Sequence, residues 1–307
     1  MAATYNRNQR LAPYLMLAPY VLLTCVFFLY PLAYATLLAF HQTNGPLSWN
    51  YVGTKNFSFI LADPAFHKAV VNTAIYAAFS IGLQLPLSLG LAMLLNSGND
   101  RAKSFFRLAI FAPNLVGPVF VGVLFFVMFA PQIGLFNQLM HMVFGWITHL
   151  PGGSGEGFLQ YEWLGNPKLV MPALIIVSLW LYVGFNMIYF LAALQNVNRE
   201  LLDAASIDGA DPWARFRHIV MPEIRPVAGF VVLLSVIGSF QLFELPWVLL
   251  NNSAGPGDRG LTVVMYLYQT GFLTGDLGYA SAIGWVLGLL LTGVAFVQAR
   301  LARAEVP

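Results

Sequence analysis

Long apolar runs separated by short polar segments make up most of the chain. A helix needs about 20 apolar residues to cross roughly 30 Å of hydrocarbon, and six runs are long enough and nearly free of charged side chains. These runs cover residues 12–40, 69–95, 105–130, 169–195, 227–250 and 279–299. The pattern predicts an all-α integral membrane protein with six transmembrane helices, forming a single domain over residues 1–307.

The first run has two features of a signal peptide. It follows Arg7 and Arg10, and Ala33-Tyr34-Ala35 resembles a cleavage site. Its apolar core, however, is about twice as long as the 7–15 residues of a signal-peptide core. We therefore expect an uncleaved first span.

A further apolar segment, residues 133–150, is almost long enough to cross the membrane as well. The distribution of Lys and Arg argues against this crossing, because cytoplasmic loops carry an excess of both. With six spans and the N-terminus inside, the inside residues are Arg7, Arg10, Arg101, Lys103, Arg107, Arg199, Arg215, Arg217, Arg225, Arg300 and Arg303, and the outside residues are Lys55, Lys68, Lys168 and Arg259. A seventh crossing leaves seven inside and eight outside. We therefore expect six spans, with both termini in the cytoplasm.

The same segment has the spacing of an amphipathic helix. Apolar residues recur at helical intervals, with polar ones among them. The apolar positions are Leu135, Leu139, Met142 and Trp146, and the polar ones are Asn137, Gln138, His141 and His149. We expect this helix to lie on the outer membrane surface, within an outer loop of residues 131–168.

Composition supports lipid as the solvent. The chain is 58% hydrophobic and 9% charged, whereas soluble domains carry roughly 25% charged residues. A net charge of +2 gives no reason to expect nucleic acid as a partner. The single Cys25 lies in an apolar run, which excludes a disulfide framework and indicates no metal site.

The most polar segment, residues 199–226, lies between the fourth and fifth runs, on the cytoplasmic side of the predicted topology. Asn198 suits a helix N-cap, Gly209 suits a helix end, and Asp211-Pro212 suits a second start. Pro222 and Pro226 are expected to end the second helix. The segment therefore predicts a helix-turn-helix along the membrane surface, for which the alternative is a simple connection between spans.

This segment resembles the "EAA" signature of bacterial ABC-importer permeases. The matching residues are Asp203-Ala204-Ala205, Asp208-Gly209-Ala210, Phe216, Ile219, Met221-Pro222 and Pro226. Asp203 replaces the usual Glu, which shortens the side chain by one methylene, and Met221 replaces Leu. By resemblance, the ATPase-coupling residues are Asp203, Ala204, Ala205, Asp208, Gly209, Ala210, Phe216, Ile219 and Pro222.

Further similarity to carbohydrate-uptake permeases of the maltose-importer type extends over most of the chain. It includes Pro113, the Trp180 region, the turn from Asn252 to Pro256, and the stretch from Thr262 to Phe272. The resemblance implies a bacterial inner-membrane permease subunit that itself performs no covalent chemistry. Its implied partners are a homologous second permease, two ATP-binding subunits and an extracytoplasmic solute-binding protein. ATP and Mg²⁺ would bind at the ATPases and no cofactor would bind to this chain.

A substrate site is indicated where polar and aromatic residues fall within the spans. Glu244 is an intramembrane carboxylate, which marks a functional candidate. Phe240, Gln241, Glu244 and Trp247 are predicted to share one helical face, where rings and polar groups suit a sugar. The remaining candidates are Asn114 in the third run and Ser178, Tyr182 and Phe185 in the fourth, where Asn186 lies near the same face. By resemblance, Ser178, Tyr182 and Phe185 also match contact positions of the family. The alternative is that Gln241 and Glu244 bond neighbouring spans.

These observations favour an ATP-driven importer of a neutral sugar or polyol, since no Lys or Arg lies deep in a span. A glycerol-3-phosphate-type or other small-solute importer permease is the alternative. A secondary transporter would be expected to show repeats, discontinuous helices or several intramembrane acids. A membrane enzyme would need clustered catalytic groups.

Overall fold

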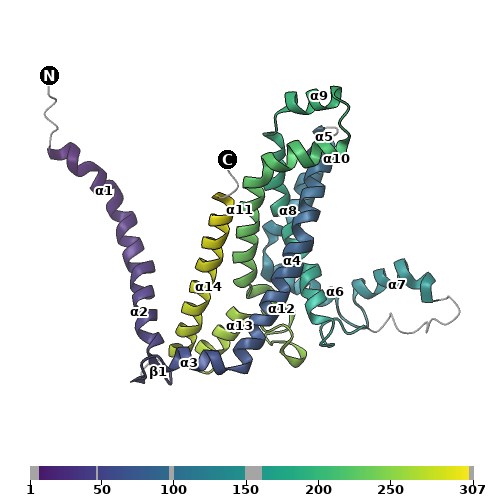
Figure 1. The fold of residues 1–307 in the computed structure, drawn as a ribbon. Helices are drawn as coiled ribbons and strands as arrows, with labels where there is room; N and C mark the ends of the chain where they lie inside the picture. The colour runs from purple at the N-terminus through teal and green to yellow at the C-terminus, as the bar shows by residue number, and fades with distance from the viewer. Residues whose placement is uncertain (1–6, 46–47, 97–99, 149–160, 304–307) are drawn as a thin grey trace. The chain divides into compact units, whose positions relative to one another are not determined.

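The computed structural model describes residues 7–45, 48–96, 100–148 and 161–303. These residues are helical apart from one two-stranded hairpin and the connecting turns, which confirms the predicted all-α membrane fold (Figure 1). The chain divides into two compact units, Met1–Asp63 with Leu267–Leu289, and Pro64–Tyr266 with Leu290–Pro307. A single domain over residues 1–307 stays a prediction.

The first unit begins with one long apolar helix. It comprises α1 (Arg7–Thr24), a π-helical turn η1 (Cys25–Leu29) and α2 (Tyr30–Ala39). A hairpin follows, with β1 (His41–Thr43) antiparallel to β2 (Trp49–Tyr51), and then α3 (Lys55–Ala62). The unit is completed by the π-helical turn η4 (Gln269–Leu273) and the first part of α14 (Leu277–Arg303).

Buried polar groups hold this unit together. The Asn56 amide donates to the carbonyls of Ala39 and His41, at 3.0 and 2.9 Å. The Tyr279 hydroxyl donates to the buried Asp63 carboxylate at 2.7 Å. These bonds tie α3 to the hairpin and α14 to the end of α3, and each satisfies a group that burial would otherwise leave unpaired.

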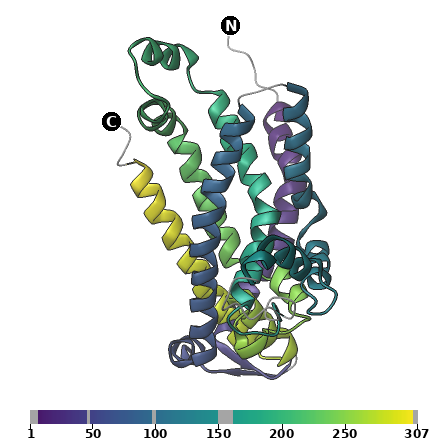
Figure 2. The ribbon, with the colours of Figure 1, turned by 90° about the vertical axis from the view of Figure 1, so that its right-hand side faces the viewer.

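The second unit is a bundle whose central pair is α4 and α8. Its elements are α4 (Pro64–Asn96), α5 (Asp100–Val116), α6 (Pro118–Met128), α7 (Leu135–Thr148), α8 (Val170–Gln195), α9 (Arg199–Ile207), α10 (Pro212–Arg215), η2 (Phe216–Val220), α11 (Met221–Phe240), α12 (Glu244–Leu249), η3 (Pro256–Asp258) and α13 (Val263–Tyr268). The last two residues of α13 belong to the first unit. Helices α4 and α8 lie side by side (Figures 1 and 2).

Small and polar side chains join these two helices. The Ser80 hydroxyl of α4 lies 3.4 Å from the Ser178 hydroxyl of α8. The Ser88 hydroxyl donates to the Val183 carbonyl at 2.9 Å. Such residues let membrane helices approach closely and bond across their interface. Gly184 allows a similar approach, because a Cβ there would overlap the Ile110 carbonyl of α5.

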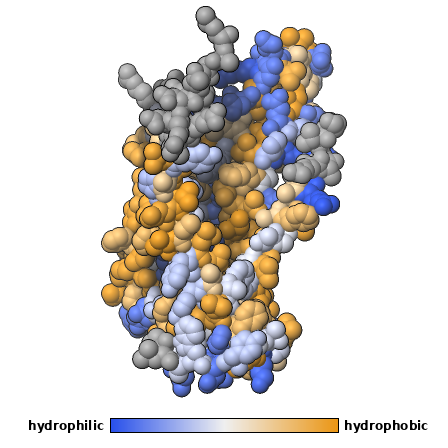
Figure 3. Space-filling view, turned by 90° about the vertical axis from the view of Figure 1, so that its left-hand side faces the viewer, coloured by the Kyte–Doolittle hydropathy of each residue, from blue (hydrophilic) through white to orange (hydrophobic). Residues whose placement is uncertain are grey.

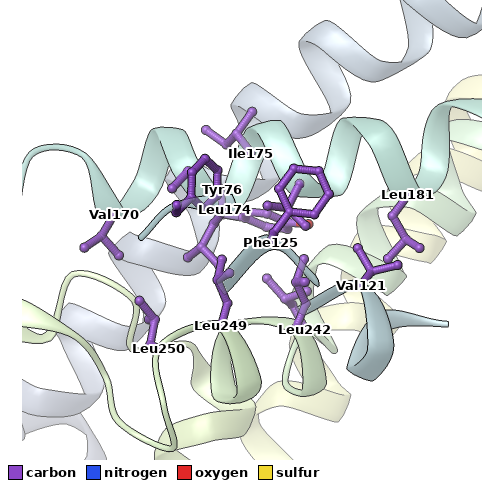
Figure 4. Packing of buried hydrophobic residues seen from close by; sticks show 14 residues of the cluster. Tyr76, Val121, Phe125, Val170, Leu174, Ile175, Leu181, Leu242, Leu249 and Leu250 are labelled. Carbon is purple, nitrogen blue, oxygen red and sulfur yellow. The ribbon is translucent and has the colours of Figure 1, made fainter. Parts of the chain in front are cut away.

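An apolar core lies at one end of the α4–α8 pair, between α4, α6, α8 and α12 (Figure 4). Phe125, Leu174 and Leu245 are almost completely buried in it. Gly122 of α6 packs against Val248 of α12, where an added Cβ would lie 3.1 Å from the Val248 side chain. A second core, around Met187, Phe190 and Ile224, joins α8 to α11.

The third predicted span, residues 105–130, is not a single straight helix. It consists of α5 and α6, bent by 96° at Gly117. Gly117 has φ +87°, which glycine accepts without cost, and Pro118 has the fixed φ of a first helical residue. Five described helices are long and apolar enough to cross a membrane, and there are six if this bent pair is one span.

The predicted end of the fifth span, at residue 250, was wrong. Helix α11 stops at Phe240, and α12 is a separate helix of six residues. Pro246 explains the break, because in a continuous helix its ring would clash with the carbonyl four residues earlier. That carbonyl belongs to Leu242, and it accepts a hydrogen bond from the Thr262 hydroxyl at 2.7 Å.

The prediction that Pro222 and Pro226 end the second helix of the polar segment was also wrong. Helical structure continues without interruption from Pro212 to Phe240. The π-helical turn η2 ends at Val220, two residues before Pro222, and in both ribbon views the chain changes direction near this junction. Proline and π turns are common sites of helix bending, so the prolines turn the helix without ending it.

The outer surfaces of the helices are apolar, as a lipid environment requires. Phe27, Phe120 and Phe296 are 74%, 71% and 58% exposed. Figure 3 shows one face, on which hydrophobic side chains predominate along the middle of the helices and hydrophilic ones gather near their ends. On α7, the predicted apolar positions Leu135, Leu139 and Met142 are also exposed. Trp146 and His141 lie where no side chain is described, and His149 lies outside the described residues.

Candidate functional site

A cavity of about 170 Å³ lies within the second unit, between α4, α8 and α11. It is lined by Tyr76, Gln84, Tyr182, Phe185, Asn186, Leu234, Ser235, Gly238 and Ser239. None of these side chains carries a formal charge at neutral pH. Two amides, four hydroxyl groups and a phenyl ring therefore surround a space within the membrane-spanning helices.

The polar groups of the cavity are held inside the protein. Gln84 and Asn186 are only 6% and 3% exposed, and the Asn186 side-chain nitrogen has no hydrogen-bond partner among the described residues. A buried unpaired amide costs free energy, and such groups in native structures commonly have a water or a ligand as partner. Asn186 thus lines the cavity with an amide whose N–H groups helix packing does not use.

Three of the predicted substrate-binding residues lie together on α8. Tyr182 and Phe185 line the cavity. Ser178 does not, because it is fully buried, and its hydroxyl donates to the Ile175 carbonyl at 2.8 Å. The Ser178 hydroxyl also lies 3.4 Å from the Ser80 hydroxyl of α4. Ser178 therefore joins α8 to α4 behind the cavity.

The other predicted residues lie outside this lining. Phe240, Gln241, Glu244 and Trp247 do not share one helical face as predicted, because the helix breaks between Phe240 and Glu244. Glu244 is the exposed first residue of α12, close enough to Tyr182 to interact electrostatically. A carboxylate is favoured at this position by the helix dipole.

Asn114 and Trp247 have separate settings. Asn114 is half-buried on α5, three residues before the Gly117 break. Trp247 stacks on Phe243, with ring centroids 5.7 Å apart. Whether either residue contacts substrate stays a prediction.

The sequence reasoning missed the contribution of α4. Its polar residues recur at every fourth position and form the face that meets α8. The residues are Asn72, Tyr76, Ser80, Gln84 and Ser88. This spacing was visible in the second apolar run, and a polar stripe within a span indicates either helix–helix bonding or a site. Here it provides both, since Ser80 and Ser88 bond α8 while Tyr76 and Gln84 line the cavity.

The polar segment between α8 and α11 is built as its capping residues predict. The Asn198 side chain accepts from the Glu200 N–H at 2.9 Å, and the Asp211 side chain accepts from the Ala214 N–H at 2.5 Å. Gly209 has φ +83°, and the Ala210 N–H returns to the Ala205 carbonyl at 2.9 Å. This is a Schellman ending, in which the left-handed residue closes the helix.

The surface of this segment is free to bind another molecule. No residue of α9 or α10 is buried among the described residues. Leu201, Ile207 and Trp213 are 49%, 86% and 65% exposed. The Asn198 N–H donates to the Glu223 carboxylate at 3.3 Å, which fastens the start of α9 to α11. Asp203, Ala204, Asp208, Gly209 and Pro222 are exposed, whereas Ala205, Ala210, Phe216 and Ile219 are half-buried.

Comparison with known proteins gives full-length relatives. The chain is 35% identical over 295 residues to an arabinooligosaccharides transport system permease protein of Bacillus subtilis, covering 96% of this chain and 89% of that protein. It is 32% identical to a lactose transport system permease protein of Rhizobium radiobacter, covering 94% and 93%. It is also 30% identical to an sn-glycerol-3-phosphate transport system permease protein of Yersinia pestis, covering 96% and 95%.

Solved structures share the fold. A chain of a bacterial ABC transporter that imports the acidic polysaccharide alginate matches with a TM-score of 0.80 and 20% identity, covering 96% of both chains. A chain of the alginate transporter in complex with its pentasaccharide-bound periplasmic protein matches with a TM-score of 0.81, covering 98% and 97%.

The family model described as the inner membrane component of binding-protein-dependent transport systems matches residues 58–305. Proteins of this kind are transport subunits and not enzymes. The chain belongs to the family of binding-protein-dependent transport system inner membrane components, the permease subunits of ABC transporters.

Proposed function

We propose that this permease imports a neutral sugar or polyol, by exposing the cavity between α4, α8 and α11 alternately to the two sides of the membrane. The observation that carries the proposal is the lining of that cavity. It combines the Tyr182 and Phe185 rings with the Gln84 and Asn186 amides and has no formal charge. Rings suit the apolar faces of a sugar, while amides and hydroxyl groups suit its hydroxyls. Two relatives are named for an oligosaccharide and a disaccharide.

A glycerol-3-phosphate importer is the second candidate, because several relatives carry that name. A phosphate group is normally met by Arg, Lys or oriented N–H groups. No Arg or Lys is among the described residues that line the cavity, and Glu244 is close enough to Tyr182 to interact electrostatically with it. The carboxylate would repel a phosphate, so a neutral substrate fits better.

The transport cycle requires further subunits. We infer that the α9–α10 surface binds one of two ATPases, which hold the ATP and Mg²⁺, and that a homologous second permease completes the pathway. Exposed Ile207 and Trp213 give this surface apolar anchors, and Asp203 and Asp208 give it negative charge. Both termini then lie in the cytoplasm of a bacterium, and a solute-binding protein delivers substrate to the opposite side.

Reconstitution tests this function. The permease, the second permease and the ATPases are placed in liposomes, and the solute-binding protein is added on the delivery side. A thermal-shift screen of the binding protein identifies the sugar. Uptake of that sugar is expected to require ATP hydrolysis, with glycerol 3-phosphate failing to compete. Uptake driven by a proton or sodium gradient without the ATPases would contradict the importer mechanism, and competition by glycerol 3-phosphate would contradict the neutral-substrate assignment.

A further inference from the structure

Basic residues that are far apart in the sequence meet at one place in the second unit. Lys68 lies near the start of α4, Lys168 precedes α8, and Arg259 follows η3. Lys68 is neutralised by Asp258 at 3.0 Å. Lys168 and Arg259 line a separate cavity of about 280 Å³ with Asn72, Ile75, Pro167 and Met171. Neither of these two cations has an acidic partner among the described residues.

Hydrogen bonds fix the backbone that carries Arg259. The buried Asn72 amide donates to the Asp258 carbonyl at 2.8 Å and to the Leu261 carbonyl at 3.1 Å. These two carbonyls lie on either side of Arg259, so the turn is clamped to α4 around it. Asp258 itself has φ +51°, an uncommon backbone conformation that such a clamp holds in place.

The backbone of Lys168 is fixed as well. Its N–H donates to the Asn166 side chain at 3.0 Å, and the Leu169 N–H donates to the Asn166 carbonyl at 2.9 Å. Two cations on rigid turns lose less entropy on binding an anion than cations on mobile loops do. The cavity is therefore preorganised for a negative ligand.

The floor of the cavity is apolar and belongs to membrane-spanning helices. Ile75 is the twelfth residue of α4 and is 37% exposed, and Met171 is the second residue of α8. Val71, one turn before Ile75, is 55% exposed. The cations thus stand where two candidate spans begin, beside exposed apolar side chains. An anion with apolar chains attached matches both parts.

We propose that this cavity binds an anionic phospholipid, with the headgroup phosphodiester between Arg259 and Lys168 and an acyl chain along Ile75 and Met171. The guanidinium of Arg259 is suited to bidentate contact with phosphate oxygens, and the Lys168 ammonium acts as a point charge. Basic pockets between membrane helices on the cytoplasmic or matrix side bind lipid headgroups, and the same charge complementarity applies to this cavity. An acidic protein surface would use the cations but leave the apolar floor unoccupied. The inference does not depend on the transported solute or on which membrane face the cavity occupies.

Native mass spectrometry of the purified transporter tests the proposal. Delipidated complex is titrated with phosphatidylglycerol or with phosphatidylcholine of identical acyl chains. The wild-type complex is expected to bind phosphatidylglycerol more tightly, and Lys168→Gln with Arg259→Gln to weaken that lipid by about 30-fold, since each surface cation contributes roughly five-fold. Lys55→Gln removes another exposed cation outside this cavity, and it is expected to leave the affinity unchanged.

Three results would overturn the proposal. The first is equal affinity of the wild-type complex for the two lipids, and the second is unchanged phosphatidylglycerol affinity in the double variant. The third is equally tight binding of glycerophosphoglycerol, which has the same phosphodiester without acyl chains and would identify a site for soluble phosphate esters. If the second result is accompanied by loss of binding of the solute-binding protein to the double variant, the two cations belong to a protein-docking surface.

Discussion

Asn186 lines the proposed solute cavity with an amide that ordinary helix packing does not use. Its amide is 3% exposed and its nitrogen has no partner among the described residues, whereas Ser80 and Ser88 of the facing helix are bonded to α8. Membrane helices normally use buried amides to join one another. An amide that is unpaired in the empty protein would gain a hydrogen bond when a solute binds. It would therefore stabilise the solute complex relative to the empty protein.

Replacing Asn186 with Leu separates these two roles. The substitution removes an unpaired polar group whose burial costs about 1–3 kcal/mol, so the melting temperature of the purified permease complex is expected to hold or rise. Loss of a solute hydrogen bond worth about 0.5–1.5 kcal/mol is expected to raise the half-saturation concentration for uptake by roughly 2- to 12-fold.

Gln195→Leu is the matched control, because Gln195 is an exposed amide on the same helix and lies outside the cavity. It should change neither the uptake constant nor the melting temperature. If Asn186→Leu destabilised the complex while uptake by the surviving protein was normal, Asn186 would be a packing residue.

At the scale of elements, local sequence signals were sufficient to predict a helix start or end wherever one residue determines the backbone conformation there. Asn198, Gly209 and Asp211 predicted the caps and the turn, and the structure has each of them. The 96° bend and the end of α11 were not predicted. An apolar run has the same composition whether its helix is straight or bent, so the composition of the run does not reveal the bend. Pro246 prevents a hydrogen bond to the Leu242 carbonyl, and that carbonyl instead accepts from Thr262, which is distant in the sequence.

The cavity was predicted incompletely for a related reason. Tyr182 and Phe185 were identified from the fourth run, but the Phe240–Trp247 group rested on an unbroken helix. Residues of α4 line the cavity because α4 packs against α8. The sequence of one apolar run does not show which other helix it packs against. The α9–α10 surface, by contrast, depends on local caps and was therefore accessible from sequence.

Gly209 tests the coupling role of that surface. Gly209→Val places a β-branched residue at φ +83°, where an L-residue costs about 1–2 kcal/mol, although no atom lies within 4 Å of the added Cβ. We expect the α9–α10 turn to distort and the ATPases to be lost from the purified complex, while the spans still insert. Co-purification and ATP-driven uptake measure the effect.

Gly209→Asn is the control, since Asn tolerates the left-handed conformation and should retain the ATPases. Normal assembly and uptake in Gly209→Val would exclude a coupling role for this turn.

For the whole molecule, orientation is the prediction with the widest consequences. With Cys25 replaced by Ser, single cysteines at Ser206 and Ser253 place one exposed thiol on α9 and one in the turn after α12. A membrane-impermeant maleimide is expected to label Ser253→Cys in intact spheroplasts and Ser206→Cys only in inside-out vesicles. Labelling of both from one side would contradict the proposed topology.

The break at Gly117 has a consequence for how the protein is assembled in the cell. Backbone groups left open in hydrocarbon cost several kcal/mol each, and α5 and α6 have only 17 and 11 residues. The partners that shield them come later in the chain, because α5 packs on α8 and α6 packs on α12. The bent pair therefore reaches its final form only after Leu249 has left the ribosome and entered the membrane. Until then, α5 and α6 lack the helices that cover them in the finished bundle.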